Sequence, residues 1–110
     1  MNDCIFCKIA AGQIPADIVY EDKDYMAFRD LNPKARIHIL IIPKYHSPNL
    51  AETTGEVLAH LPAFLRETAE RLGVEEKGYR LLTNTGPDAG QEVFHLHFHL
   101  LAGEKLGDII

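Results

Sequence analysis

Val93-Phe94-His95-Leu96-His97-Phe98-His99-Leu100-Leu101 is the stretch that decides the fold and the chemistry of this chain. Histidines alternate with apolar residues, and the side chains of a strand alternate between its two faces. The pattern therefore predicts a strand over 93–101, with the imidazoles of His95, His97 and His99 on one face and apolar side chains on the other. Alternate residues of a strand lie roughly 6.5–7 Å apart, so three imidazoles on an undistorted strand do not all bind one small ion.

Two plainer interpretations of these histidines stay open at this point. One is a polar strand edge that faces solvent, although three of the six histidines stand in strict alternation here. The other is a metal-binding His-x-His pair, because neutral imidazole is a common metal ligand.

The rest of the chain predicts an antiparallel sheet around one long helix. A short helical turn is expected at 4–10, and strands are expected at 18–20, 25–28, 36–42 and 79–84. Polar residues 21–24 make the first two strands a hairpin. The strand over 36–42 is apolar at nearly every position, which indicates burial on both faces. These elements indicate an α+β fold with about five strands.

Apolar residues between 57 and 72 recur at helical spacing. Thr53 and Glu56 predict a capping box at the start of this helix, and Gly73 predicts its end. Pro62 lies inside the pattern, so we expect the helix to be kinked or split there.

Composition narrows the function classes. A chain of 110 residues fits a single domain over 1–110. A net charge of −5 argues against a general nucleic-acid-binding protein, which needs a basic face. The longest apolar run, 39–42, is too short to span a bilayer, and no signal segment precedes it, so we expect a cytoplasmic protein without membrane contact. In that compartment the Cys4-x-x-Cys7 pair indicates metal binding or redox work rather than a disulfide.

Residues 90–101 resemble the signature of the histidine triad (HIT) family, in which three histidines alternate with apolar residues after Gly-Gln-x-Val. Segments 5–9, 14–16, 28–33 and 38–44 are similar to the same family, so the resemblance covers nearly the whole chain. It is greatest to the Hint-like nucleoside phosphoramidases, in their zinc-binding bacterial type. The resemblance implies a HIT-like fold and a nucleotide hydrolase that works as a homodimer.

The resemblance also implies a role for individual residues. His97 would attack the α-phosphorus of a purine nucleotide or nucleoside phosphoramidate, and water would cleave the nucleotidyl-histidine intermediate. His99 would stabilise the developing charge on the phosphate, and Asp30 would bind the ribose hydroxyls. The other implied nucleotide-binding residues are Phe6, Ile9, Phe28 and Leu31 around the base, His38 behind the triad, and Asn84, Gly90, Gln91 and Val93 at the phosphate.

The residues alone also allow simpler roles. Without the resemblance, Phe6, Ile9, Phe28 and Leu31 are interpreted as core, and Asp30 and Asn84 are interpreted as turn residues.

Glu92 departs from the family pattern, because many animal relatives have a serine there that donates to the leaving group. A carboxylate is repelled by phosphate, so Glu92 is expected to be protonated, to turn away, or to act as a catalytic proton donor. The chain after Leu101 also lacks the family's longer tail with its Trp-Pro ending, which leaves the preference for a leaving group open.

The metal expectation combines the cysteine pair with the resemblance. Cys4, Cys7, His46 and His95 would form a Cys₂His₂ set, which is a closed structural zinc site rather than a catalytic one. The alternative is a pair of buried thiols. Two other functions also stay open, namely a dinucleoside polyphosphate hydrolase of the same superfamily and a nucleotide-binding regulatory module with little turnover.

Overall fold

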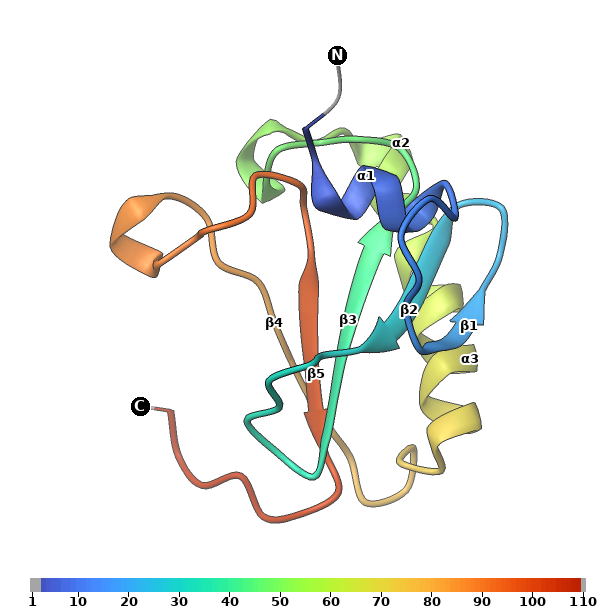
Figure 1. The fold of residues 1–110 in the computed structure, drawn as a ribbon. Helices are drawn as coiled ribbons and strands as arrows, with labels where there is room; N and C mark the ends of the chain where they lie inside the picture. The colour runs from blue at the N-terminus through green and yellow to red at the C-terminus, as the bar shows by residue number, and fades with distance from the viewer. Residues whose placement is uncertain (1–2, 110) are drawn as a thin grey trace.

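The computed structural model describes residues 3–109, and within that range five strands form one antiparallel sheet in the order β1-β2-β3-β5-β4 (Figure 1). The strands are β1 Ile18–Glu21, β2 Tyr25–Arg29, β3 Ile37–Pro43, β4 Arg80–Leu82 and β5 Phe98–Ala102. The helices are α1 Ile5–Ala10, α2 Gly55–Ala59 and α3 Leu61–Leu72, with 3₁₀ turns η1 at Leu50–Glu52 and η2 at Pro87–Ala89. The α+β prediction is confirmed. Residues 1, 2 and 110 of the expected domain lie outside the described residues.

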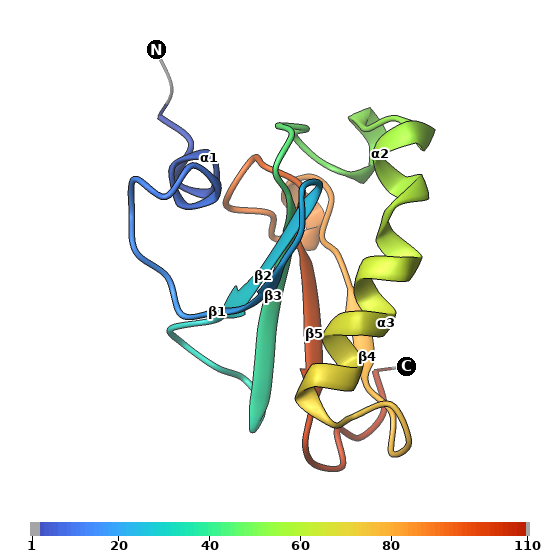
Figure 2. The ribbon, with the colours of Figure 1, turned by 90° about the vertical axis from the view of Figure 1, so that its right-hand side faces the viewer.

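The sheet has a different helix layer on each face (Figure 2). On one side α1 covers a cluster of buried apolar residues, namely Phe6, Ile9, Met26, Phe28, Leu40 and Ile42. On the other side α2 and α3 cover a larger cluster that includes Tyr25, Ile39, Ile41, Phe64, Leu96, Phe98 and Leu100. β3 contributes to both clusters, which confirms that it is covered on both faces. Within 3–109 no helix is long and apolar enough to cross a membrane.

The predicted long helix is split, as Pro62 suggested. α2 ends and α3 begins at His60, and Pro62 sits in the first turn of α3, where its missing N–H costs nothing. The predicted capping box is wrong by one residue, because the hydroxyl of Thr54 accepts from the N–H of Val57. Gly73 ends α3 at φ 71°, as expected. The Tyr25 hydroxyl donates to the carbonyl of Val57 at 2.9 Å, which ties β2 to α2.

The strand that contains the histidines is shorter than predicted: β5 begins at Phe98 and not at Val93. Its neighbour β3 pairs with it up to Ile41 and ends at Pro43, which has no N–H to continue a ladder. The N–H of Leu96 instead donates to the carbonyl of Ser47 at 2.6 Å. The strand expected over 79–84 is likewise reduced to Arg80–Leu82.

The predicted division between the two faces nevertheless holds across residues 95–100. Leu96, Phe98 and Leu100 are buried in the cluster under α3. His95 and His97 lie against the ring of Phe6 in α1, and the rings of His97 and His99 are 5.2 Å apart. All three imidazoles therefore face the α1 side of the molecule.

Candidate functional site

Two adjoining hollows bring most of the predicted site residues together. The first, of about 240 Å³, is lined by Phe6, Asp30, Leu40, Asn84, Gly90, Gln91, Glu92, Val93, His97 and His99. All of these except Leu40 were predicted from the sequence. The second, of about 400 Å³, is lined by Asp30, Asn32, Lys34, His38, Leu82, Asn84, Glu92, His99 and Leu101. The two hollows share Asp30, Asn84, Glu92 and His99, so they form neighbouring parts of one candidate site.

The backbone of the same segment selects one tautomer of the neutral His97 ring. Its Nδ1 lies 2.8 Å from the carbonyl oxygen of His95. A carbonyl oxygen only accepts hydrogen bonds, so Nδ1 carries the proton and donates. In the neutral ring Nε2 is then unprotonated, and its lone pair is available to attack an electrophile.

A chain of hydrogen bonds also fixes the form of His99. The backbone N–H of Lys34 donates to His38 Nδ1 at 3.0 Å, so the proton of neutral His38 lies on Nε2. That nitrogen donates to His99 Nδ1 at 2.9 Å. The proton of neutral His99 is therefore on its Nε2, which is left as a donor for an anionic ligand such as a phosphate oxygen.

Burial keeps the two hydrogen-bonded imidazoles, His38 and His99, uncharged. The pKa of His99 is lowered to about 4, chiefly by burial and then by the positive charges that His97 and His38 would carry. The pKa of His38 is also lowered by burial, which outweighs the opposite effect of Asp30. Both rings are therefore expected to be neutral near pH 7, in the forms that the hydrogen bonds specify.

Asp30 divides its two oxygens between a turn and the site. Oδ1 accepts from the N–H of Asn32 at 2.8 Å, which is the turn role that the sequence also allowed. Oδ2 lies 3.4 Å from His38 Nε2 at the rim of both hollows.

Asp30, His38 and His99 are close enough to suggest a cation site, but the hydrogen bonds argue against it. A metal on His38 Nε2 would move the ring proton to Nδ1, against the N–H of Lys34.

The residues expected around the base separate into two groups. Phe6 and Ile9 of α1 and Phe28 of β2 are buried between α1 and the sheet. The Phe6 ring packs edge-on against His97, with the ring centroids 5.1 Å apart. The core interpretation therefore describes these three correctly, and Phe6 also lines the hollow. Leu31 is 98% exposed beside Asp30, so the interpretation of Leu31 as core is wrong.

Cys4, Cys7, His46 and His95 converge in a separate cluster, with all four ligand atoms within 4.8 Å of one another. His95 Nε2 lies 2.8 Å from the carbonyl of Pro43 and donates to it, which leaves the Nδ1 lone pair facing the cluster. His95 Nδ1 is 3.3 Å from Cys4 Sγ, 3.4 Å from Cys7 Sγ and 3.1 Å from His46 Nδ1.

These distances fit a shared cation. Ligands bound at about 2.0–2.3 Å around a tetrahedral ion are roughly 3.3–3.8 Å apart, close to the spacings of this cluster. The cluster can therefore hold a metal ion. Its four protein donors would complete a tetrahedral shell, so the ion would have a structural role.

Sequence reasoning missed several residues of the site. Leu40 lies opposite His99 in the β3–β5 pair, and its place two residues after His38 could have predicted that shared face. Lys34 brings a positive charge to the second hollow, beside the predicted turn. Thr83, whose hydroxyl donates to the carbonyl of His97 at 2.7 Å, carried no signal in the sequence.

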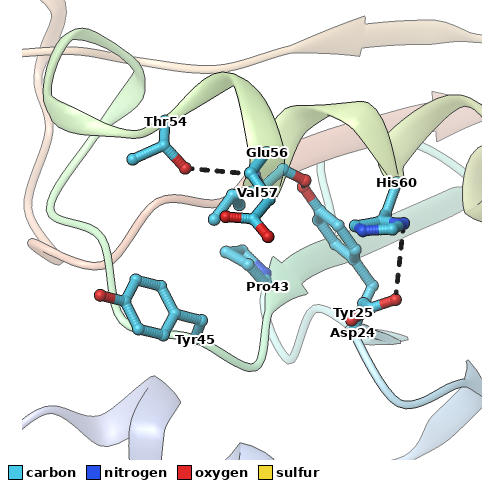
Figure 3. Close-up of a pocket in the computed structure, with 8 residues that line it drawn as sticks. All are labelled: Asp24, Tyr25, Pro43, Tyr45, Thr54, Glu56, Val57 and His60. Atoms are coloured by element: carbon cyan, nitrogen blue, oxygen red, sulfur yellow. Dashed lines mark hydrogen bonds and ion pairs between the residues drawn. The ribbon is translucent and has the colours of Figure 1, made fainter.

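A further hollow of about 370 Å³ lies beside α2 and contains none of the predicted site residues (Figure 3). It is lined by Asp24, Tyr25, Pro43, Tyr45, Thr54, Glu56, Val57 and His60. The predicted site residues therefore gather at the two hollows beside His99 and not at this one.

Comparisons with known proteins identify the family of this chain. A family model described as the HIT domain matches residues 11–106. A purine nucleoside phosphoramidase of Escherichia coli is 43% identical over 112 residues, covering 99% of this chain and 94% of the relative.

Solved structures resemble this chain in both sequence and fold. A histidine triad protein from Clostridium difficile aligns with a TM-score of 0.94 and 44% identity, covering 100% of this chain and 98% of the other. A HIT family hydrolase from Clostridium thermocellum gives a TM-score of 0.92 and 46% identity, with coverage of 100% and 98%. The chain therefore belongs to the HIT family.

Proposed function

We propose that this protein hydrolyses purine nucleoside 5′-phosphoramidates at the α-phosphorus through a nucleotidyl-histidine intermediate on His97. The observation that carries the proposal is the 2.8 Å contact between His97 Nδ1 and the carbonyl of His95, which leaves Nε2 as the nucleophilic atom. The similarity to a purine nucleoside phosphoramidase supports the choice of substrate.

The proposed reaction has two displacements at phosphorus. His97 Nε2 forms a bond to the α-phosphorus while the bond to the leaving nitrogen breaks, and the amine leaves with a proton that Glu92 supplies. Water then attacks the same phosphorus and returns a proton to Glu92. The bond to His97 Nε2 breaks, which releases the nucleoside monophosphate and restores His97. The N–H of His99 stabilises the negative charge that develops on the phosphate oxygens in both steps.

The other residues of the two hollows bind and orient the nucleotide. Asp30 accepts hydrogen bonds from the ribose, and Phe6 contacts the base with the neighbouring apolar residues. Asn84 and the backbone around Val93 border the phosphate. Glu92 is exposed and lines both hollows, so we place it where it exchanges a proton with the leaving amine.

The test compares substrates. Purified protein is incubated with adenosine 5′-phosphoramidate or with diadenosine polyphosphates, and the release of AMP is measured. We expect faster turnover of the phosphoramidate. Faster turnover of the diadenosine compounds would instead identify a dinucleoside polyphosphate hydrolase, and AMP binding without turnover would identify a regulatory module.

We further propose that the metal is zinc and that its role is structural. The two thiolates and two imidazoles of the cluster are the ligand set that structural zinc prefers. The ion would join α1, which follows Cys4 and contains Cys7, to the segments that carry His46 and His95, and thereby hold Phe6 against His97.

We also propose a cytoplasmic homodimer. The outer edges of β1 and β4 have no strand beside them within residues 3–109. A second copy that pairs with one of these edges would extend the sheet and cover unpaired backbone groups. Light scattering at micromolar concentration is expected to give twice the chain mass of 12.3 kDa, and a monomer mass would contradict the proposal.

A further inference from the structure

Gln91 has every side-chain hydrogen-bonding group engaged inside the protein. It is buried, and its Oε1 accepts from the N–H of Gly86 at 2.9 Å. Its Nε2 donates to the carbonyls of Pro48 at 2.8 Å and Val93 at 3.1 Å. A glutamine amide has two N–H donors, so neither is left for a ligand. Its backbone N–H is also engaged, with the carbonyl of Gly86 at 3.1 Å.

These bonds join two loops that have different roles. The 84–93 loop supplies much of the lining of the first hollow. The 43–49 loop contains His46, one of the four residues of the metal-binding cluster. Gln91 stands in the first loop and binds Pro48 in the second, two residues from His46. The side chain therefore connects the loop that carries His46 to the loop that lines the first hollow.

The connection matters because both loops lie outside the sheet, apart from Pro43, the last residue of β3. No strand includes residues 83–97, which follow β4 and precede β5. Besides Gln91, this segment meets the 43–49 loop through His95 and Leu96. His95 Nε2 donates to the Pro43 carbonyl, His95 Nδ1 lies 3.1 Å from His46 Nδ1, and the N–H of Leu96 donates to the Ser47 carbonyl. These contacts all lie at residues 95 and 96, whereas Gln91 also reaches Gly86 at the far end of the 84–93 loop.

We propose that Gln91 is a positioning residue that transmits the state of the metal-binding cluster to the 84–93 loop. A bound metal fixes His46 and so fixes the 43–49 loop. Through its hydrogen bonds to Gly86 and Val93, Gln91 then fixes the position of the 84–93 loop. This loop forms part of the lining of the hollow around His97. This inference rests on the proposed function for its catalytic consequence, but the mechanical coupling does not depend on turnover.

The first test measures coupling without any substrate. Amide hydrogen exchange is followed with zinc bound and after zinc is removed with a chelator. Loss of zinc is expected to speed exchange in the 84–93 loop by about tenfold in the original protein. In Gln91→Met this loop is expected to exchange fast whether or not zinc is present, while the 43–49 loop stays sensitive to zinc.

Two further variants sharpen this test. Gln13→Met is the matched control, because Gln13 is exposed and should behave as the original protein does. Gln91→Glu keeps an acceptor for Gly86 but loses both donors, so it should also uncouple the loops. Zinc-dependent exchange of the 84–93 loop in both Gln91 variants, or zinc-independent exchange in the original protein, would overturn the proposal.

The second test separates positioning from direct contact with the phosphate. For adenosine 5′-phosphoramidate, Gln91→Met is expected to lower kcat by about 10- to 100-fold with little change in KM, since a misplaced site slows chemistry more than binding. A rise in KM with unchanged kcat would show direct substrate contact instead. If the original protein does not hydrolyse the phosphoramidate, the proposed function fails and hydrogen exchange still decides the coupling.

Discussion

His97→Ala is expected to lower the turnover of adenosine 5′-phosphoramidate by on the order of 10³- to 10⁵-fold, because it removes the atom that attacks phosphorus. Nucleotide binding should remain, since Asp30 and the apolar residues under α1 are unchanged. His97→Gly with added imidazole should recover part of the rate, because free imidazole can occupy the space of the missing ring. Steady-state kinetics and AMP binding by calorimetry measure these effects.

The control and a trapped intermediate make this result specific. His60 is about half exposed and lies outside both hollows, so His60→Ala should leave turnover nearly unchanged. Rapid acid-free quenching of the original enzyme with labelled substrate should trap a nucleotidyl group on the protein, and His97→Ala should trap none. If the variant keeps most of its activity and no adduct forms, the assignment of the nucleophile is wrong.

Cys4→Ser should destabilise the protein strongly, but only when zinc is available. Cys4 Sγ caps α1 by accepting from the N–H of Cys7, and serine can keep that role while being a poor zinc ligand. A ligand present at a thousand times its Kd stabilises a fold by about 4 kcal/mol. For a domain of this size we expect a loss of roughly 15–30 °C in Tm. KM should also rise, since α1 carries Phe6.

The same variant distinguishes a structural metal from a catalytic one. After zinc is removed with a chelator, the original protein and Cys4→Ser should melt at the same temperature, because the ligand no longer matters. Elemental analysis of protein purified without chelator should find one zinc per chain. Protein that contains no zinc, with a Tm that Cys4→Ser does not change, would contradict the site. Activity that follows zinc content and disappears entirely with Cys4→Ser would favour a metal hydrolase.

The alternation of residues 95–100 was sufficient to predict which side chains share a face, because burial of Leu96, Phe98 and Leu100 fixes the other three. It was not sufficient to predict where the strand begins. That boundary depends on where β3 ends, and Pro43 is distant in sequence from His95. The alternative interpretation of Leu31 as core failed because Leu31 lies in a turn outside the sheet, where no second layer packs on it.

The residues of the candidate site were predicted largely through the family resemblance, whereas their roles depend on contacts that no pattern encodes. Gln91 is the clearest case. The resemblance implied a place beside the phosphate, and Gln91 does border the hollow. Both of its amide donors are engaged, however, with Pro48 and Val93, and its Oε1 accepts from Gly86. Such engagement depends on two loops meeting in space, which local sequence does not specify.

The hydrogen bonds that run from the Lys34 backbone through His38 to His99 all point the same way. This direction determines which inhibitor groups His99 can bind. A compound that offers an acceptor to His99, such as a sulfonamide oxygen or a carboxylate, meets an N–H that is already oriented. A compound that offers an amine N–H there meets another donor, and accommodating it would require protons to shift through both rings up to a backbone amide that cannot accept one. Compounds with acceptors at this position should therefore be favoured over otherwise identical ones with donors.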